Sequence, residues 1–180
     1  MLHCHSNACK APWRVYWGVE KGGTRVANVA STYYSYPTPY GAVTIRTSAR
    51  GVCEISFGQV SLAGAHKPST ISNEAATQIQ EYFAGKRWSF DVPLDINGSA
   101  FQNLVWEAVS EIPYGECRSS ADIAEMLGKP GSHRSVGTAV RRNPVPLLIP
   151  THRVLMASPA TKNERMMHAL LAFEQRNLGS

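Results

Sequence analysis

The chain has 180 residues, of which 43% are hydrophobic, a formal net charge of +5 at pH 7 and a pI near 9.2. This length allows one good-sized domain or two small ones, and this apolar content supports a real core, which excludes a disordered chain. No apolar segment approaches the length of about 20 residues that a membrane-spanning helix needs, so we expect no membrane partner. The positive charge favours an anionic partner, although many proteins that bind no nucleic acid are equally basic.

Residues 1–32 are predicted to be an N-terminal extension, and its first ten residues lack the apolar centre of a signal peptide. The cysteines show no disulfide or zinc-finger spacing, which favours a reducing cytoplasmic location, or a nuclear one in a eukaryote; they are Cys4, Cys9, Cys53 and Cys117. Near the N-terminus, Cys4 and Cys9 with His3 and His5 leave metal binding open. Their spacing matches no established zinc site, and a loose terminus is the alternative.

Residues 33–97 are predicted to form a small α/β domain that begins with a hairpin. The prolines and glycine of residues 36–41 predict a turn. Residues 42–47 and 52–57 each alternate β-branched or apolar residues with polar ones, which is typical of strands. The sequence therefore predicts a β-hairpin with one apolar face.

A helix and a boundary follow this hairpin. Ser72 is a candidate N-cap for a helix over residues 73–84, and Gly85 is a candidate stop. The Asn97-Gly98 pair then predicts a turn. We place the domain boundary there, so that residues 98–180 form the second domain.

The second domain is predicted to contain two short helices joined by a tight turn. Ser99 is a candidate cap for a first helix over residues 100–111. Ser119 and Asp122 resemble a capping box that opens a short helix over residues 121–127, and another helix should cover residues 132–142. Such a pair is the layout of a DNA-binding helix-turn-helix, although it is also common in proteins that never contact DNA.

The charge around this pair favours DNA. From Gly128 through Asn163 the chain contains no acidic residue and six cationic ones, which are Lys129, Arg134, Arg141, Arg142, Arg153 and Lys162. A local positive surface of this kind neutralises phosphates.

Residues 143–154 combine a buried segment with a polar triplet. Prolines flank the apolar residues 145–149, which predicts a buried strand or extended segment. Thr151, His152 and Arg153 follow directly. In the last helix, opened by a capping box of Thr161 and Glu164, the side chains of Met167, Leu170, Leu171 and Glu174 share one face. Glu174 therefore points inward, where a carboxylate needs a partner.

Short motifs recur in order along the second half of the chain. They are Phe101-Gln-Asn-Leu-Val-Trp106, Ile112-Pro-Tyr-Gly-Glu116, Asp122-Ile-Ala124, Gly128-Lys-Pro130, Arg134-Ser-Val-Gly-Thr-Ala139, Arg142-Asn-Pro-Val-Pro146 and Pro150-Thr-His-Arg-Val154. At this spacing the chain resembles the O6-alkylguanine-DNA alkyltransferases, also called methylated-DNA–protein-cysteine methyltransferases. The resemblance extends over roughly residues 33–178, and the ordered set is highly specific.

The resemblance implies an α+β fold. A small N-terminal β-sheet and helix domain (33–97) would precede a mainly helical domain (98–180) with a winged-helix-like helix-turn-helix. It also implies a monomer that needs no cofactor. The implied partners are double-stranded DNA, including DNA that contains O6-alkylguanine, and other DNA repair proteins.

In that family the second helix lies in the minor groove, and an arginine at its start takes the place of the guanine that is rotated out of the stack. Arg134 matches this arginine, and a simple phosphate contact is the alternative. Gly137 and Thr138 are small enough to let the helix approach the groove, although helix packing would select them too. The remaining residues assigned to the DNA surface are Ser120, Ser135, Arg141, Arg142 and Arg153.

The resemblance also assigns a reaction centre. His152 and Glu174 match the pair that, through a water, takes the proton of the family's nucleophilic thiol, and Asn143 matches the asparagine that braces this segment. Thr151 occupies the position of the nucleophilic cysteine. An alcohol is far less acidic than a thiol, so Thr151 should not accept a methyl group at a useful rate.

Two further departures change the surroundings of this centre. Ser120 stands where the family usually has a tyrosine that presses on the target phosphate, and the run over residues 156–165 is shorter than the family's loop around the extruded base. We therefore expect a DNA-binding protein that recognises alkylation damage and has lost alkyl transfer, as alkyltransferase-like proteins have.

Two alternatives stay open. One is an active methyltransferase, either because residue 151 was altered from Cys or because another cysteine serves. Cys117 is the candidate for that role, against the interpretation of a small, half-buried thiol without chemistry. The other alternative is a decayed paralogue that serves as an interaction module.

Overall fold

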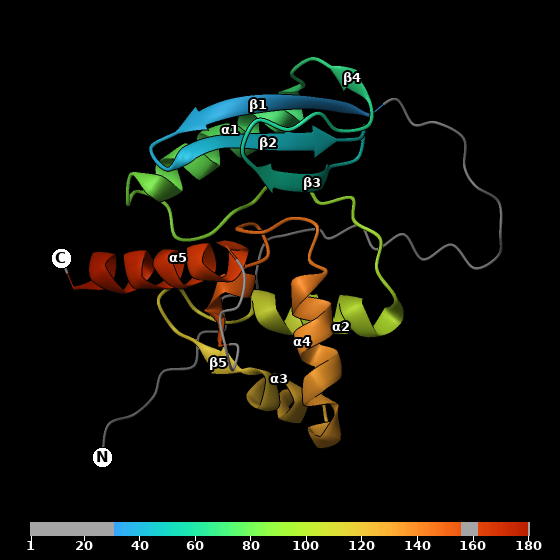
Figure 1. Cartoon of the computed structure of the whole chain (residues 1–180), viewed down its shortest axis with the longest axis vertical. Coiled ribbons are helices and arrows are strands. Elements are labelled where there is room, and N and C mark those ends of the chain that lie inside the picture. Colours follow the sequence, from blue (N-terminus) through green and yellow to red (C-terminus); the bar gives the residue numbers. More distant parts are fainter. Residues whose placement is uncertain (1–30, 156–161, 180) are drawn as a thin grey trace, which may run out of the picture.

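The computed structural model describes residues 31–155 and 162–179. Its first half is a four-stranded sheet with strand order β3-β2-β1-β4 and one helix packed on it (Figure 1). The strands β1 to β3 are antiparallel neighbours, and β4 pairs with β1 in parallel. The elements are β1 (Thr32–Thr38), β2 (Gly41–Thr47), β3 (Val52–Phe57), β4 (Ala65–His66) and α1 (Thr70–Phe83).

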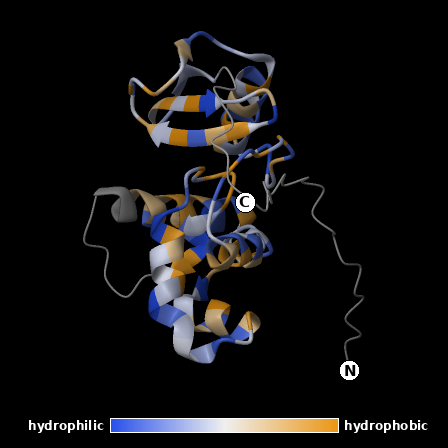
Figure 2. Cartoon of the chain, turned by 90° about the vertical axis from the view of Figure 1, so that its right-hand side faces the viewer, coloured by the Kyte–Doolittle hydropathy of each residue, from blue (hydrophilic) through white to orange (hydrophobic). Residues whose placement is uncertain are grey.

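The hairpin predicted over residues 42–57 is confirmed, and Figure 2 shows polar and apolar residues alternating along its strands. The predicted turn over residues 36–41 is wrong in extent, because β1 continues through Thr38 and only Pro39 and Tyr40 form the turn. Pro37 is tolerated within this strand because β4 pairs only with Thr32 and Tyr33, so one side of β1 is open at Pro37.

The N-cap of helix α1 lies three residues before the predicted cap. Ser69 is the N-cap, and its hydroxyl accepts from the Ser72 backbone while the Ser72 hydroxyl accepts from the Ser69 backbone. Ser72 is therefore the inner partner of a capping box rather than the cap. Gly85, with a φ of +70°, follows the C-cap as predicted.

The second half is mainly helical and lies below the sheet in Figure 1. The caps predicted at Ser99 and Ser119 are confirmed, and each belongs to a capping box. Helices α3 and α4 pack against each other. The elements are α2 (Ala100–Ser110), β5 (Arg118–Ser119), α3 (Ser120–Met126), the 3-10 turn η1 (Pro130–Ser132), α4 (His133–Arg141), the 3-10 turn η2 (Thr151–Arg153), β6 (Val154–Leu155) and α5 (Lys162–Leu178).

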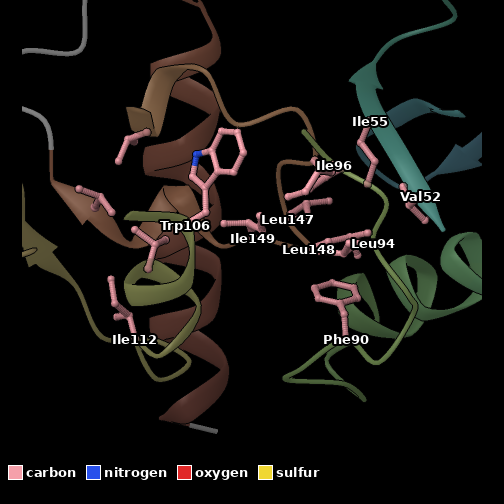
Figure 3. Close-up of a cluster of buried hydrophobic side chains, with 14 of the residues drawn as sticks. Val52, Ile55, Phe90, Leu94, Ile96, Trp106, Ile112, Leu147, Leu148 and Ile149 are labelled. Atoms are coloured by element: carbon pink, nitrogen blue, oxygen red, sulfur yellow. The ribbon is translucent and has the colours of Figure 1, made fainter. Parts of the chain in front are cut away.

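One hydrophobic core runs through both halves. Figure 3 shows Ile55 of β3 close to Ile96 and to the apolar loop around Leu147, with Trp106 of α2 on the far side of that loop. Backbone hydrogen bonds join the halves as well: the Ile55 N–H donates to the Pro144 carbonyl at 2.8 Å. The α+β fold is confirmed, while the domain boundary near residue 97 stays a prediction.

The remaining sequence-based expectations concern a membrane-spanning helix and residues near the gaps in the described structure. Among the described residues, no helix is both long and apolar enough to cross a membrane. The histidine and cysteine cluster of residues 3–9 and the capping box of Thr161 and Glu164 lie outside what the structure describes.

Candidate functional site

The loop over residues 143–150 is buried, but it is not the predicted strand. Leu147 has a φ of +76°, and a single bridge pairs Pro146 with Ile149, so the chain doubles back within four residues. The apolar side chains still enter the core, and Leu147 is 1% exposed. The prediction of burial is therefore confirmed, and the prediction of an extended conformation is wrong.

Asn143 holds this loop in shape with one amide group. Its Nδ2 donates to the Ile149 carbonyl at 3.0 Å, and its Oδ1 accepts from the Val145 N–H at 3.0 Å. The same Nδ2 donates to Thr151 Oγ1 at 3.1 Å. Because Thr151 accepts this bond, its hydroxyl keeps its own proton for donation to another group. The bracing role predicted for Asn143 matches this geometry.

His152 and Glu174 form the predicted pair in the interior. His152 Nε2 lies 2.6 Å from Glu174 Oε1, and both side chains are fully buried. Three further groups converge on the same carboxylate. The Tyr82 hydroxyl donates to Oε1 at 2.8 Å, the Gly115 N–H donates to Oε2 at 2.8 Å, and the Arg153 guanidinium donates to both oxygens.

These contacts fix the protonation of the pair. Burial raises the pKa of Glu174, but the hydrogen bonds from His152 and Arg153 outweigh burial and hold that pKa at about 2. Burial lowers the pKa of His152, and its hydrogen bond to Glu174 offsets only part of this effect. At neutral pH the carboxylate is therefore ionised and the imidazole is neutral.

The tautomer of His152 follows from this. An ionised carboxylate only accepts hydrogen bonds, so the imidazole proton lies on Nε2 and Nδ1 carries a lone pair. Nδ1 is buried and has no hydrogen-bond partner among the described residues. The site thus presents a base, His152 Nδ1, in the residue adjacent to the Thr151 hydroxyl.

Thr151, His152 and Asn143 line a cavity of about 550 Å³. This volume lies within the range of small-molecule sites, roughly 300–1,000 Å³. Its walls come from both halves of the chain and from α5, and they are mostly apolar. Among the residues that form them are Ile55, Phe57, Val140, Met167 and Leu171, with Ser56 and His168 as polar members.

A second concavity, an open groove of about 610 Å³, lies between the start of α3 and the exposed face of α4. It brings together several residues assigned to the DNA surface, which are Ser120, Arg134, Gly137, Thr138 and Arg141. Arg134 is exposed, as the prediction requires. The opposite face of α4 is anchored, because Trp106 Nε1 donates to the Ala139 carbonyl at 2.9 Å.

The other residues assigned to the DNA surface lie elsewhere. Ser135 and Arg142 are exposed but do not line the groove. The prediction for Arg153 is wrong: the side chain is 8% exposed, pairs with Glu174 at 2.9 Å and donates to the Ile112 carbonyl at 2.7 Å. A guanidinium held in this way cannot reach a phosphate, and it serves to keep Glu174 ionised.

The sequence did not reveal every member of the Glu174 network. Tyr82 packs in the core, and its hydroxyl also bonds Glu174. The hydrogen bond from the Gly115 N–H could not be predicted from the sequence, because every non-proline residue has a backbone N–H. The two described cysteines, Cys53 and Cys117, are free and half-buried, and neither lines the cavity.

Two family models together match most of the chain. One, described as "6-O-methylguanine DNA methyltransferase, DNA binding domain", matches residues 100–176. The other, described as "6-O-methylguanine DNA methyltransferase, ribonuclease-like domain", matches residues 31–96. The described sheet and α1 fall within the second match, and the groove and the reaction centre fall within the first.

Curated relatives carry the name methylated-DNA–protein-cysteine methyltransferase. The protein from Methanosarcina acetivorans is 37% identical over 132 residues, which cover 70% of this chain and 85% of that protein. The constitutive protein from Bacillus subtilis is 50% identical over 90 residues, which cover 50% of this chain and 54% of that protein. The chain thus spans only about half the length of this second relative.

Solved structures give the same result. The Mycobacterium tuberculosis O6-methylguanine methyltransferase has a TM-score of 0.74 and 32% identity, covering 82% of this chain and 94% of that one. The OGT of the same organism in complex with DNA has a TM-score of 0.73 and 34% identity, covering 81% and 94%. With this coverage and identity, the chain belongs to the 6-O-methylguanine DNA methyltransferase family.

Proposed function

We propose that this protein binds double-stranded DNA through the groove beside α4, holds an extruded O6-alkylated guanine in the cavity at Thr151, and accepts no alkyl group from it. The observation that carries the proposal is the hydroxyl of Thr151, which lines the cavity next to His152. In the family that residue position belongs to a cysteine. Since the alkyl group would stay on the DNA, its removal would depend on other repair proteins.

The chemistry of displacement at saturated carbon supports the loss of transfer. A cysteine thiol, with an ordinary pKa of about 8.5, can become a thiolate when a base such as a neutral histidine lies near it. A threonine hydroxyl cannot become an alkoxide with the same base, because it is far less acidic. A neutral His152 is a base of this kind, and it cannot generate a comparable nucleophile from the Thr151 hydroxyl.

DNA binding is supported by the exposed side of α4. Arg134 and Thr138 lie one turn apart along the groove, and buried Val136 and Ala139 fix the opposite side of the helix in the core. The relative from Mycobacterium tuberculosis with 34% identity was solved in complex with DNA. A guanidinium at the start of such a helix can fill the space that an extruded base leaves.

A direct test combines binding with intact-protein mass spectrometry. The protein is incubated with a duplex containing O6-methylguanine and with the matched plain duplex, and its affinity for each is measured by competition. We expect tighter binding to the alkylated duplex and no gain of mass. Equal affinity for both duplexes would remove lesion recognition, and no binding to either would overturn the proposal.

The second candidate function is an active methyltransferase, which is favoured by the retained His152–Glu174 pair and by the names of the curated relatives. A gain of one methyl group by the natural protein would establish it. The variant Thr151→Cys separates the candidates further: it should gain one methyl group, with a bond forming to Sγ as the bond from carbon to guanine O6 breaks. Thr151→Ser is the matched control and should gain none.

The third candidate is an interaction module without a DNA role. Under the proposal, Arg134→Ala should weaken binding to every duplex, and the effect should be largest for the alkylated one. Unchanged DNA binding by this variant would favour the interaction module instead. The exposed Arg50, which pairs with Asp95 in the first half of the chain, offers a control substitution that removes the same charge outside the groove.

A further inference from the structure

The groove beside α4 and the cavity at Thr151 meet at two side chains. Arg141 and Leu155 line both concavities. These two residues therefore form the boundary between the groove and the cavity. Arg141 is a cation suited to phosphate, whereas Leu155 places an apolar surface at the same junction.

Leu155 is 43% exposed, which by itself means little, because single exposed leucines are common. Its surroundings distinguish it. The groove around it includes the polar and cationic residues Ser119, Ser120 and Arg134, and the cavity behind it is lined by apolar residues such as Val154, Met167 and Leu171. Leu155 is thus an apolar residue that the groove and the cavity share.

The backbone of Leu155 is held in place by strand pairing and by the residue before it. Strand β6 pairs in parallel with β5, where Leu155 is the partner of Ser119, the residue that caps α3. The preceding residue, Val154, is 5% exposed and anchors the strand in the core. A side chain on such a support keeps its position without help from a ligand.

The small side chain of Ser120 makes this position more important. In the family a bulky tyrosine usually stands there and presses on the target phosphate, and a serine cannot supply the same contact area. Leu155 lies in the same groove as Ser120. Apolar side chains that contact displaced bases are a common device of minor-groove proteins.

We propose that Leu155 is a positioning residue for the extruded nucleotide. Its side chain packs against the deoxyribose and the base as the nucleotide enters the cavity, and it stabilises the extruded state. This inference rests on the proposed function. In addition to that function, it assigns to Leu155 an effect on the fraction of bound DNA in which the target base is extruded.

The test separates binding from extrusion. A duplex carrying 2-aminopurine as the target base and a fluorophore at one end reports extrusion by the rise in 2-aminopurine emission, and binding by anisotropy. For Leu155→Ala we expect an emission rise at saturation about fivefold smaller than that of the natural protein. Alanine buries less apolar surface against the extruded nucleotide than leucine does, so it stabilises the extruded state less. Affinity for an unmodified duplex should change less than about twofold, since the groove contacts remain.

Leu104 offers a matched control. It is a leucine of α2 with 44% exposure, and it lines neither concavity. Leu104→Ala should behave like the natural protein in both measurements, and Leu155→Met, which keeps an apolar side chain of similar volume, should retain most of the emission rise.

Three outcomes decide the matter. Normal extrusion by Leu155→Ala, in a protein whose natural form binds and extrudes, overturns this inference and leaves the proposed function standing. An equal loss of affinity for the unmodified duplex also overturns it, because Leu155 would then be a general groove contact. Failure of the natural protein to bind DNA overturns the proposed function itself.

Discussion

Glu174 shows how a single buried carboxylate makes stability depend on pH. With its pKa held at about 2, against an ordinary 4.5, it stabilises the folded state above pH 4.5 and loses this contribution as the pH falls toward 2. The full effect is about 3 kcal/mol. The lowered pKa of His152 acts in the same direction, because the unfolded chain takes up a proton below pH 6.5 and the folded chain resists it.

We therefore predict that the free energy of unfolding decreases from pH 6.5 downward and decreases more steeply below pH 4.5. Urea unfolding at a series of pH values measures it. His152→Gln should flatten the curve between pH 6.5 and 4.5, since glutamine does not titrate. A protein that is equally stable at pH 7 and pH 3 would contradict this account of the pair.

At the scale of the element, the loop over residues 143–150 depends on Asn143. The amide of this residue satisfies the Ile149 carbonyl and the Val145 N–H, both within a buried segment. Asn143→Ala leaves these groups unpaired, at a cost of roughly 1–3 kcal/mol for each, so we expect a destabilisation of about 2–5 kcal/mol in urea unfolding. Asn97→Ala, at an exposed asparagine, should change stability by less than about 0.5 kcal/mol.

The same loop marks the limit of what the sequence could predict. Helix starts at Ser99 and Ser119 were predictable because a capping box is set by residues three positions apart. The positive φ of Leu147 was not, because it depends on where the Asn143 amide finds its partners. Likewise, the charge of Arg153 suggested DNA, and only the fold reveals that its partner is a carboxylate 21 residues later.

The candidate site also has parts that the sequence could predict and parts that it could not. The motif and the helical periodicity placed His152 and Glu174 together correctly, because one residue faces inward on α5 and the other follows a buried segment. The contribution of β3 to the cavity was not predictable. Ile55 and Phe57 reach it only because the sheet packs against residues 143–150, which is a contact between distant parts of the chain.

At the scale of the whole molecule, Tyr82 joins the two halves through the site. It lies on α1 beneath the sheet, it is fully buried, and its hydroxyl donates to Glu174 of α5 at 2.8 Å. Together with the continuous core, this bond predicts that the described halves unfold as one cooperative unit. Tyr82→Phe removes a hydrogen bond to an ionised group and should lower the free energy of unfolding by roughly 1.5–3 kcal/mol.

Amide hydrogen exchange tests the coupling, because it reports stability residue by residue. Ile45 of β2 and Val109 of α2 are both fully buried and lie in different halves. In the natural protein their amides should exchange with similar free energies, and Tyr82→Phe should lower both by the same amount. Tyr40→Phe, at a tyrosine that is 65% exposed, should lower neither. If Tyr82→Phe loosens Ile45 and leaves Val109 protected, the sheet half unfolds by itself, and the cavity that it walls at Ile55 opens without loss of the helical half.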